Sequence, residues 1–428
     1  MQDVNRIYIR SVEDRMNRPV VLTAVISLFL VFAATSSAQT YSITDIGRLS
    51  PAAINIWGQV VGDYNGHAFL WTKWGGMQDL GTLAGGTYSS AGAINDLGVV
   101  TGVADGPGTI WAESYPPLAC DALNQPFTWT KKTGMLGLND TAYAGLRSEF
   151  RDSELCQDLD DYPSDINVHS QIVGSNRELG TYKWGFSGKT NGQPLTIYAD
   201  VWQTALSGIN NWGQMSGYTT SDFSYDLFYE SHAATWVQEV KTDLGTLGGD
   251  ADDWSYCSGA SAINDLGLVV GWSTITSSAR PCMTDVYDSQ ASIHAVVWQP
   301  GSGIEDLGTL PGDTSSAAQK VNFFGRVIGS SGNAISWQDG KPGGGLTVVI
   351  GRPFIWTQQN GMRDLNGLIP HRSGWVLTSV SGINIWGQIV GSGMKNGETH
   401  GFLLTPRFFF QDGRSRQNAR SRGPVGKM

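Results

Sequence analysis

The sequence contains little charge. Lys, Arg, Asp and Glu make up 15% of its 428 residues, while aromatic residues make up 11%, which argues against a disordered chain. The formal net charge is −10 at pH 7. We therefore expect neither nucleic acid nor an anionic membrane surface as a partner, because the electrostatic interaction would be repulsive.

The motifs of familiar catalytic and metal sites are missing as well. The sequence has no G-x-S-x-G, H-E-x-x-H or P-loop, and no C-x-x-C that would support a zinc ribbon or a redox motif. A D-x-D-x-D-G calcium loop is also absent. We predict no catalytic residue, no metal ligand and no cofactor; calcium bound by acidic loops is the one alternative.

Long apolar runs are absent except at the N-terminus, where the chain reads PVVLTAVISLFLVFAATSSAQT from Pro19. Arg15 and Arg18 precede this run, and the small residues Ser36 and Ala38 follow it, as in a secretory signal peptide. The alternative, an uncleaved anchor, is disfavoured because about 16 apolar residues are short for a span of roughly 20. We predict a signal peptide over residues 1–38, with Met16 as an alternative start, and a secreted protein, extracellular or periplasmic.

The chain is rich in residues of strands and turns, and it repeats. It holds 55 Gly and 16 Trp, with much Thr, Val and Tyr. An Asn followed by Gly seven residues later occurs seven times, at Asn55/Gly62, Asn95/Gly102, Asn167/Gly174, Asn210/Gly217, Asn264/Gly271, Asn322/Gly329 and Asn384/Gly391. In six copies a second Gly stands three after the Asn, as in a type I turn between two strands; Ser170 replaces it in the third copy.

Two further segments complete each unit. A short aromatic strand such as HAFLW at His67 is followed by a strand such as GMQDLGTL at Gly76. Four short strands per repeated unit predict an all-β fold, a β-propeller of about seven blades, six or eight being the error range. The last unit has no D-L-G segment, whereas Thr44–Gly47 supplies one before the first unit, so we expect the N-terminal strand to complete the C-terminal blade. A β-solenoid, parallel βαβ layers and separate sandwich modules fit the pattern less well.

The motifs AIN-x-x-G-x-VVG, HAF-x-W and GM-x-DLGTL-x-G resemble the extracellular HAF repeat of bacterial secreted proteins. The resemblance covers roughly Tyr41 to Pro406 and implies export and a repeat fold, without implying an activity. We assign residues 39–406 to the propeller and residues 407–428 to a basic, disordered tail. The third unit departs from the pattern, and its strands are left open.

Most His and Trp residues follow the repeat. Because His67, His232, His294 and His400 share one position, we expect them to be structural and to bond a neighbouring strand rather than to act as bases. Trp71, Trp129, Trp202, Trp236, Trp298 and Trp356 end the third strand and should pack between blades. Trp57, Trp212 and Trp386 fall in the Asn turn and should be exposed, where they could stack on sugar rings or a partner surface.

The long insertions mark one face of the predicted disc. Connections from strand 2 to 3 and from strand 4 to 1 emerge on the same face, opposite the Asn turns, and they hold all long insertions: 105–125, 139–164, 176–196, 219–231, 248–258, 273–293 and 330–352. The cysteines fall there too, and we predict the disulfides Cys120–Cys156 and Cys257–Cys282. Functional residues usually lie in such loops, so this face is the predicted site.

Acidic clusters in these loops give the candidate ligand-binding residues: Asp160, Asp161, Asp252, Asp253 and Trp254. We predict a monomeric, non-catalytic binding module for an extracellular glycan or protein, and expect no enzyme activity. The alternative is a secreted carbohydrate-active enzyme that uses paired carboxylates from the same loops.

Overall fold

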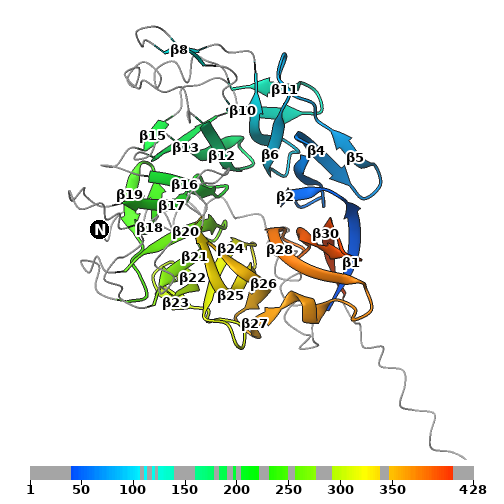
Figure 1. The fold of residues 1–428 in the computed structure, drawn as a ribbon. Coiled ribbons are helices and arrows are strands. Elements are labelled where there is room, and N and C mark those ends of the chain that lie inside the picture. The colour runs from blue at the N-terminus through cyan, green and yellow to red at the C-terminus, as the bar shows by residue number, and fades with distance from the viewer. Residues whose placement is uncertain are drawn as a thin grey trace, which may run out of the picture. The chain divides into compact units, whose positions relative to one another are not determined.

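Each sequence repeat corresponds to one four-stranded antiparallel sheet. The computed structural model describes residues 40–106, 110–112, 118–120, 124–138, 160–177, 183–189, 196–198, 204–220, 231–248, 256–275, 292–337 and 347–407. Within Tyr41–Pro406, which form one compact unit, the described strands make seven four-stranded sheets and one two-stranded ribbon (Figure 1). The predicted all-β propeller class is confirmed.

The strands have the following bounds, sheet by sheet: β2 (Ser50–Ile54), β3 (Val60–Tyr64), β4 (His67–Thr72) and β5 (Gly76–Asp79); β6 (Ser89–Ile94), β7 (Val100–Asp105), β10 (Asn124–Thr130) and β11 (Gly134–Gly137); β12 (Asp160–Ile166), β13 (Gln171–Arg177), β14 (Lys183–Lys189) and β15 (Thr196–Tyr198); β16 (Thr204–Ile209), β17 (Met215–Thr220), β18 (Ser231–Val237) and β19 (Val240–Asp243).

The remaining sheets are β20 (Ser258–Ile263), β21 (Val269–Thr274), β22 (Ile293–Gln299) and β23 (Gly303–Asp306); β24 (Ser315–Val321), β25 (Val327–Trp337), β26 (Thr347–Thr357) and β27 (Gly361–Asp364), followed by the 3-10 turn η1 (Leu365–Leu368); and β28 (Trp375–Ile383), β29 (Ile389–Lys395) and β30 (Glu398–Arg407) with β1 (Thr40–Gly47). The ribbon pairs β8 (Ile110–Ala112) with β9 (Leu118–Cys120).

The core lies between successive sheets rather than within them. Apolar clusters join each sheet to the next one along the chain, and one cluster joins the first sheet to the last, through Val60 and Phe69 against Val390 and Leu403. The tryptophans that end the third strand are buried, as predicted, with exposed fractions of 2–8%: Trp71, Trp129, Trp236, Trp298 and Trp356. Trp202 lies outside the described residues.

The repeated Gly seven residues after each Asn is explained by a bulge. In every sheet the first strand shifts register, and this Gly pairs with the residue just before the shift, as Gly62 does with Pro51 and Gly271 with Ala260. A Cβ atom on Gly271 would meet the carbonyl oxygen of Gly259 on the adjacent strand, and five of the equivalent glycines face a backbone carbonyl in the same way. Any larger residue would force the two strands apart.

The repeated His is structural, as predicted. His67, His232, His294 and His400 each place Nδ1 within 2.8–3.1 Å of an Asp carboxylate on the neighbouring strand: Asp79, Asp243, Asp306 and Asp45. The same carboxylates accept a hydrogen bond from the backbone N–H of the Gly two residues later. The D-x-G motif is therefore one half of a strand-joining contact.

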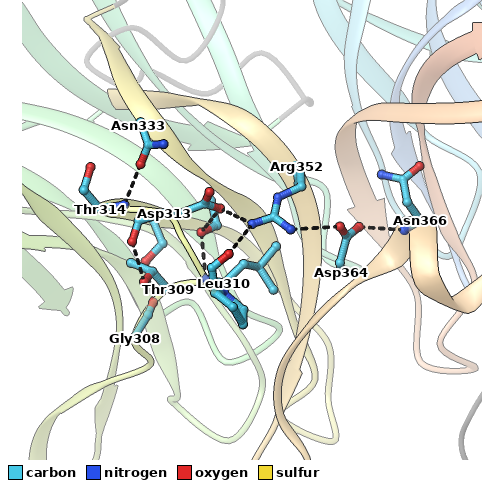
Figure 2. Close-up of polar contacts among 12 residues, drawn as sticks. Gly308, Thr309, Leu310, Asp313, Thr314, Asn333, Arg352, Asp364 and Asn366 are labelled. Carbon is cyan, nitrogen blue, oxygen red and sulfur yellow. Dashed lines mark hydrogen bonds and ion pairs between the residues drawn. The ribbon is translucent and has the colours of Figure 1, made fainter.

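In the sixth sheet Arg352 stands where other units have His. Its guanidinium contacts Asp364 (Nη1–Oδ2 3.4 Å), the counterpart of the repeated Asp, and also Asp313 (Nη2–Oδ2 2.9 Å) and the carbonyl of Pro311 (Figure 2). Asp364 in turn accepts the N–H of Asn366 and caps η1. The longer Arg side chain keeps the contact with the neighbouring strand and also binds the loop that follows β23.

Asp45 binds the N-terminal strand β1 to the last strands of the chain. Its carboxylate contacts Lys395 Nζ (2.6 Å), His400 Nδ1 (3.0 Å) and the N–H of Gly47 (2.8 Å). Partial burial raises the pKa of Asp45, but the hydrogen bonds from Lys395, His400 and Gly47 outweigh it and lower the pKa to about 2. The charged carboxylate therefore stabilises the fold above pH 3.8, and this contribution is lost as the pH falls through about 2.

We predict that Asp45→Asn lowers the free energy of unfolding by about 1 kcal/mol at pH 7, since the site is partly exposed and screened by solvent. The difference from the unmodified protein should shrink toward pH 2, where Asp45 itself becomes protonated. Urea unfolding at a series of pH values measures both, with Glu239→Gln as an exposed control. Equal stability of Asp45→Asn and the unmodified protein at pH 7 would contradict the assignment.

Some predictions are corrected by the structure, and others concern residues that it does not describe. The third unit takes β14 as its third strand and β15 as its fourth, so the prediction that Trp202 ends the third strand is wrong, and the predicted loop at 176–196 is wrong in part. The predicted loop at 330–352 is wrong in part, because β25 extends through Trp337 and β26 starts at Thr347. This segment contains the β-branched and aromatic residues Ile335, Trp337, Thr347, Val348, Val349 and Ile350, and the two strands pair along it. The segments 1–38 and 408–428 are not among the described residues, so the signal peptide and tail stay predictions.

Cys257 is fully buried and disulfide-bonded. Its predicted partner Cys282 is not among the described residues, and neither is Cys156; Cys120 ends the ribbon strand β9. The two pairings therefore stay predictions. In the described part of the chain no helix is long and apolar enough to cross a membrane.

Candidate binding pocket at the asparagine turns

The turn between the first and second strand of each unit is built by its Asn side chain. In the first unit Asn55 Oδ1 accepts the backbone N–H groups of Trp57 and Gln59 (both 3.1 Å), and the N–H of Gly58 bonds the Asn55 carbonyl. Gly58 has a φ of +73°, which favours glycine. In the third unit Ser170 adopts the same conformation at φ +56°, so the departure in sequence changes no backbone geometry.

The same side chains link every turn to the next. Each Asn Nδ2 donates to the backbone carbonyl of the following Asn, and Asn384 donates to Asn55, at 2.9–3.1 Å throughout. All seven side chains are buried, with exposed fractions of 3–6%. We call these residues the asparagine ring: Asn55, Asn95, Asn167, Asn210, Asn264, Asn322 and Asn384.

A pocket of about 240 Å³ lies inside the asparagine ring. Each turn contributes the Asn, the apolar residue before it and the residue after it. The residue after the Asn differs between turns, and these seven positions are Ile56, Asp96, Val168, Asn211, Asp265, Phe323 and Ile385. The backbone of the pocket is thus repeated, while its chemistry is set by one variable side chain per unit.

Three of the variable residues use a side-chain oxygen to accept the backbone N–H of the variable residue in the preceding turn. Asp96 Oδ1 accepts the N–H of Ile56 (3.1 Å), and Asn211 Oδ1 accepts the N–H of Val168 (3.0 Å). Asp265 Oδ1 accepts the N–H of Asn211 (2.8 Å), and its Oδ2 accepts from Asn211 Nδ2 (2.9 Å). A polar variable residue therefore satisfies the N–H of its neighbour across the unit boundary.

Five of the seven turns carry an exposed apolar side chain two residues after the Asn. Trp57 is 72% exposed, Leu97 73%, Trp212 68%, Leu266 59% and Trp386 48%. The indoles are nonetheless fixed, since Nε1 donates to the carbonyl of Asp96 from Trp57 (2.8 Å), of Asp265 from Trp212 (3.0 Å) and of Ile56 from Trp386 (2.8 Å). The predicted exposure of these three tryptophans is confirmed. We call them the indole rim.

One buried carboxylate lies close to the turns without a role in the pocket. Burial raises the pKa of Asp165, and Lys320 and two backbone hydrogen bonds lower it only in part. Its oxygens accept the N–H groups of Ile166 (2.9 Å) and Ile209 (3.0 Å), joining β12 to β16. Because both oxygens are occupied by backbone donors, we assign it a structural role.

The candidate residues predicted from the acidic clusters are not brought together by the described structure. Asp160 and Asp161 begin strand β12, paired with Arg177 and Asn176, so their placement in a loop is wrong; the strand starts earlier because β13 offers partners that far. Asp252, Asp253 and Trp254 lie outside the described residues, as does most of the long-loop face. Calcium at these clusters stays a hypothesis.

The pocket was missed by sequence reasoning that read the Asn turn only as a connection. The sequence feature that could have indicated the pocket is the residue after each Asn. This residue varies although the turn around it is constant, so the turn does not require a particular side chain there. The exposed Trp two residues later was recognised, but its position around a pocket was not.

Comparisons with known proteins add a fold likeness only. No family model and no curated protein matches the chain. Among solved structures, the β-propeller domain of the Trilobed protease from Pyrococcus furiosus, reported with an open velcro topology, is similar at 6% sequence identity and a TM-score of 0.45. The match covers 84% of this chain and 95% of that one.

Proposed function

We propose that the chain is a secreted, non-catalytic module that binds an extracellular glycan at the indole rim and the pocket inside it. The proposal keeps the predicted class of function and moves the site from the long-loop face to the face of the Asn turns. It retains the HAF-type repeat as the family the sequence resembles, and it takes the protein to act as a monomer outside the cell or in the periplasm.

The proposal includes a closed ring of seven blades. It is supported by the position of β1 beside β30 in one sheet, by the bond from Asn384 Nδ2 to the Asn55 carbonyl (3.1 Å) and by the bond from Ser381 Oγ to the Pro51 carbonyl (2.7 Å). A closed ring fixes the spacing of the indoles, and a fixed spacing lowers the entropic cost of binding a rigid ligand.

The observation that carries the proposal is the fixed orientation of exposed indoles. Trp57 and Trp212 are mostly exposed and Trp386 is about half exposed, yet the indole N–H of each donates to a backbone carbonyl of the next turn. An aromatic side chain held in one orientation presents its apolar face at little entropic cost. Sugar rings, which have apolar C–H faces, are suited to such a surface.

We predict that Trp57→Ala and Trp386→Ala each weaken glycan binding about 5–10-fold, the effect of losing one aromatic contact of about 1–1.5 kcal/mol. A glycan array of the purified mature protein identifies a ligand, and titration calorimetry of the variants measures the loss. Trp74, which is 91% exposed on the β4–β5 turn, provides the matched control as Trp74→Ala.

Equal losses in Trp74→Ala and Trp57→Ala would contradict a site at the indole rim. Binding of proteins but of no glycan would favour the protein partner instead. Polysaccharide turnover that disappears in Asp160→Asn or Asp252→Asn would favour the carbohydrate-active enzyme and its loop carboxylates.

A further inference from the structure

Four residues that line the pocket have a backbone N–H with no hydrogen bond to any described residue. Each asparagine turn presents the N–H of its variable residue toward the next unit. Those of Ile56, Val168 and Asn211 are bonded by the side chain that follows around the ring. The four that remain belong to Asp96, Asp265, Phe323 and Ile385.

The reason lies in the next side chain in each case. The residues that follow these four around the ring are Val168, Phe323, Ile385 and Ile56, respectively, and an apolar side chain cannot accept a hydrogen bond. Because the seven turns share one set of backbone and Asn hydrogen bonds, the four donors take the same direction as the three that are bonded. Backbone N–H groups lining a pocket need an acceptor, which a ligand oxygen can supply.

The charges in the pocket decide which oxygen-bearing ligand fits. Asp96 and Asp265 put two carboxylates into the lining, and the whole chain carries a net charge of −10, so an anion is disfavoured. Asp96 uses Oδ1 for the N–H of Ile56, and its Oδ2 has no hydrogen bond to any described residue. A hydroxyl group can both accept from the N–H groups and donate to the carboxylate, so a hydroxyl-bearing ligand suits this lining.

We propose that the pocket binds the terminal neutral sugar of the glycan, inserted end-on through the indole rim. Its hydroxyl oxygens accept from the N–H groups of Asp96, Asp265, Phe323 and Ile385, and one hydroxyl donates to Asp96 Oδ2. The volume of about 240 Å³ is below the ~300–1,000 Å³ of pockets for drug-sized ligands and suits a single ring. This inference rests on the proposed function and names its ligand class and pose.

Two substitutions would give an intramolecular acceptor to two of the four N–H groups while keeping the turns intact. Val168→Asn places an amide oxygen where Asn211 places one in the next unit, so it should cap the Asp96 N–H. Ile385→Asn should cap the Phe323 N–H in the same way. The double variant should bind neutral hexoses and N-acetylhexosamines at least tenfold more weakly, the effect of two lost hydrogen bonds. Its melting temperature should not fall, since two unpaired donors gain partners.

The experiment is titration of the mature protein by ligand-observed NMR with neutral monosaccharides and with hexuronates. Ile350→Asn, a substitution at a residue 61% exposed in β26, is the control for adding an amide and should bind like the unmodified protein. Retained monosaccharide binding in the capped double variant, beside a loss in Trp57→Ala, would overturn the pocket pose and leave the proposed function standing. Preference for hexuronates would overturn the neutral ligand class, and absence of any glycan binding by the unmodified protein would overturn the proposed function itself.

Discussion

Replacing Asn264 with alanine is expected to lower the free energy of unfolding by about 3–5 kcal/mol. The side chain is 6% exposed and makes three hydrogen bonds: Oδ1 accepts from the N–H groups of Leu266 and Leu268 (both 3.0 Å), and Nδ2 donates to the Asn322 carbonyl (3.0 Å). Alanine leaves two backbone donors and one acceptor without partners in a buried turn, and the penalty for such groups exceeds the value of an average hydrogen bond.

Chemical denaturation followed by tryptophan fluorescence measures this loss. Asn264→Asp keeps the acceptor but places a charge against the Asn322 carbonyl, so it should also be destabilised, whereas Asn360→Ala changes an exposed turn residue and should stay within about 0.5 kcal/mol of the unmodified protein. A shift no larger for Asn264→Ala than for Asn360→Ala would show that the asparagine ring does not hold the turns.

Gly271→Ala is expected to cost more than about 4 kcal/mol and to abolish folding at 37 °C. The added methyl group would overlap the carbonyl oxygen of Gly259 and approach Ala260 Cα, all on the adjacent strand of the same sheet. Backbone atoms in a paired strand cannot move aside without breaking the ladder between β20 and β21. The effect is steric, since Gly271 is not among the glycines with positive φ.

Two control substitutions separate space from backbone conformation. Gly367→Ala in η1 has open space and an ordinary φ, so it should be nearly neutral; Gly301→Ala has open space but a φ of +77° and should cost about 1–2 kcal/mol. Thermal melts and limited proteolysis rank the three variants. A Gly271→Ala protein as stable as Gly301→Ala would contradict the bulge as the reason for the repeated glycine.

Repetition made much of this fold predictable. The Asn and the Gly seven residues later recur in all seven units, and the His and the Trp in most of them, so each stood out. The structure gives each a repeated contact: a turn, a close strand approach, a strand-joining bond and an inter-sheet contact. Arg352 shows the limit, because it replaces His with a different side chain while making an equivalent bond to Asp364.

Features that occur once were not predictable in the same way. The third unit breaks the His and D-L-G patterns, so its last two strands had no template. Asp160 and Asp161 were read as loop carboxylates because a sequence gives no sign of how far the opposite strand extends. The pocket was missed for a further reason: its lining combines residues from all seven units, and only the ring arrangement brings them within reach of one ligand.

The variable residue after each asparagine also governs how many ways a ligand could lie in the pocket. A site with seven identical turns would offer seven equivalent orientations related by rotation about one axis. Here the turns carry Ile, Asp, Val, Asn, Asp, Phe and Ile in sequence order, and only Ile385 and Ile56, in the last and first turns, are neighbours of the same type. The backbone thus repeats while the side chains vary, so the seven rotated orientations of a ligand would not be equivalent.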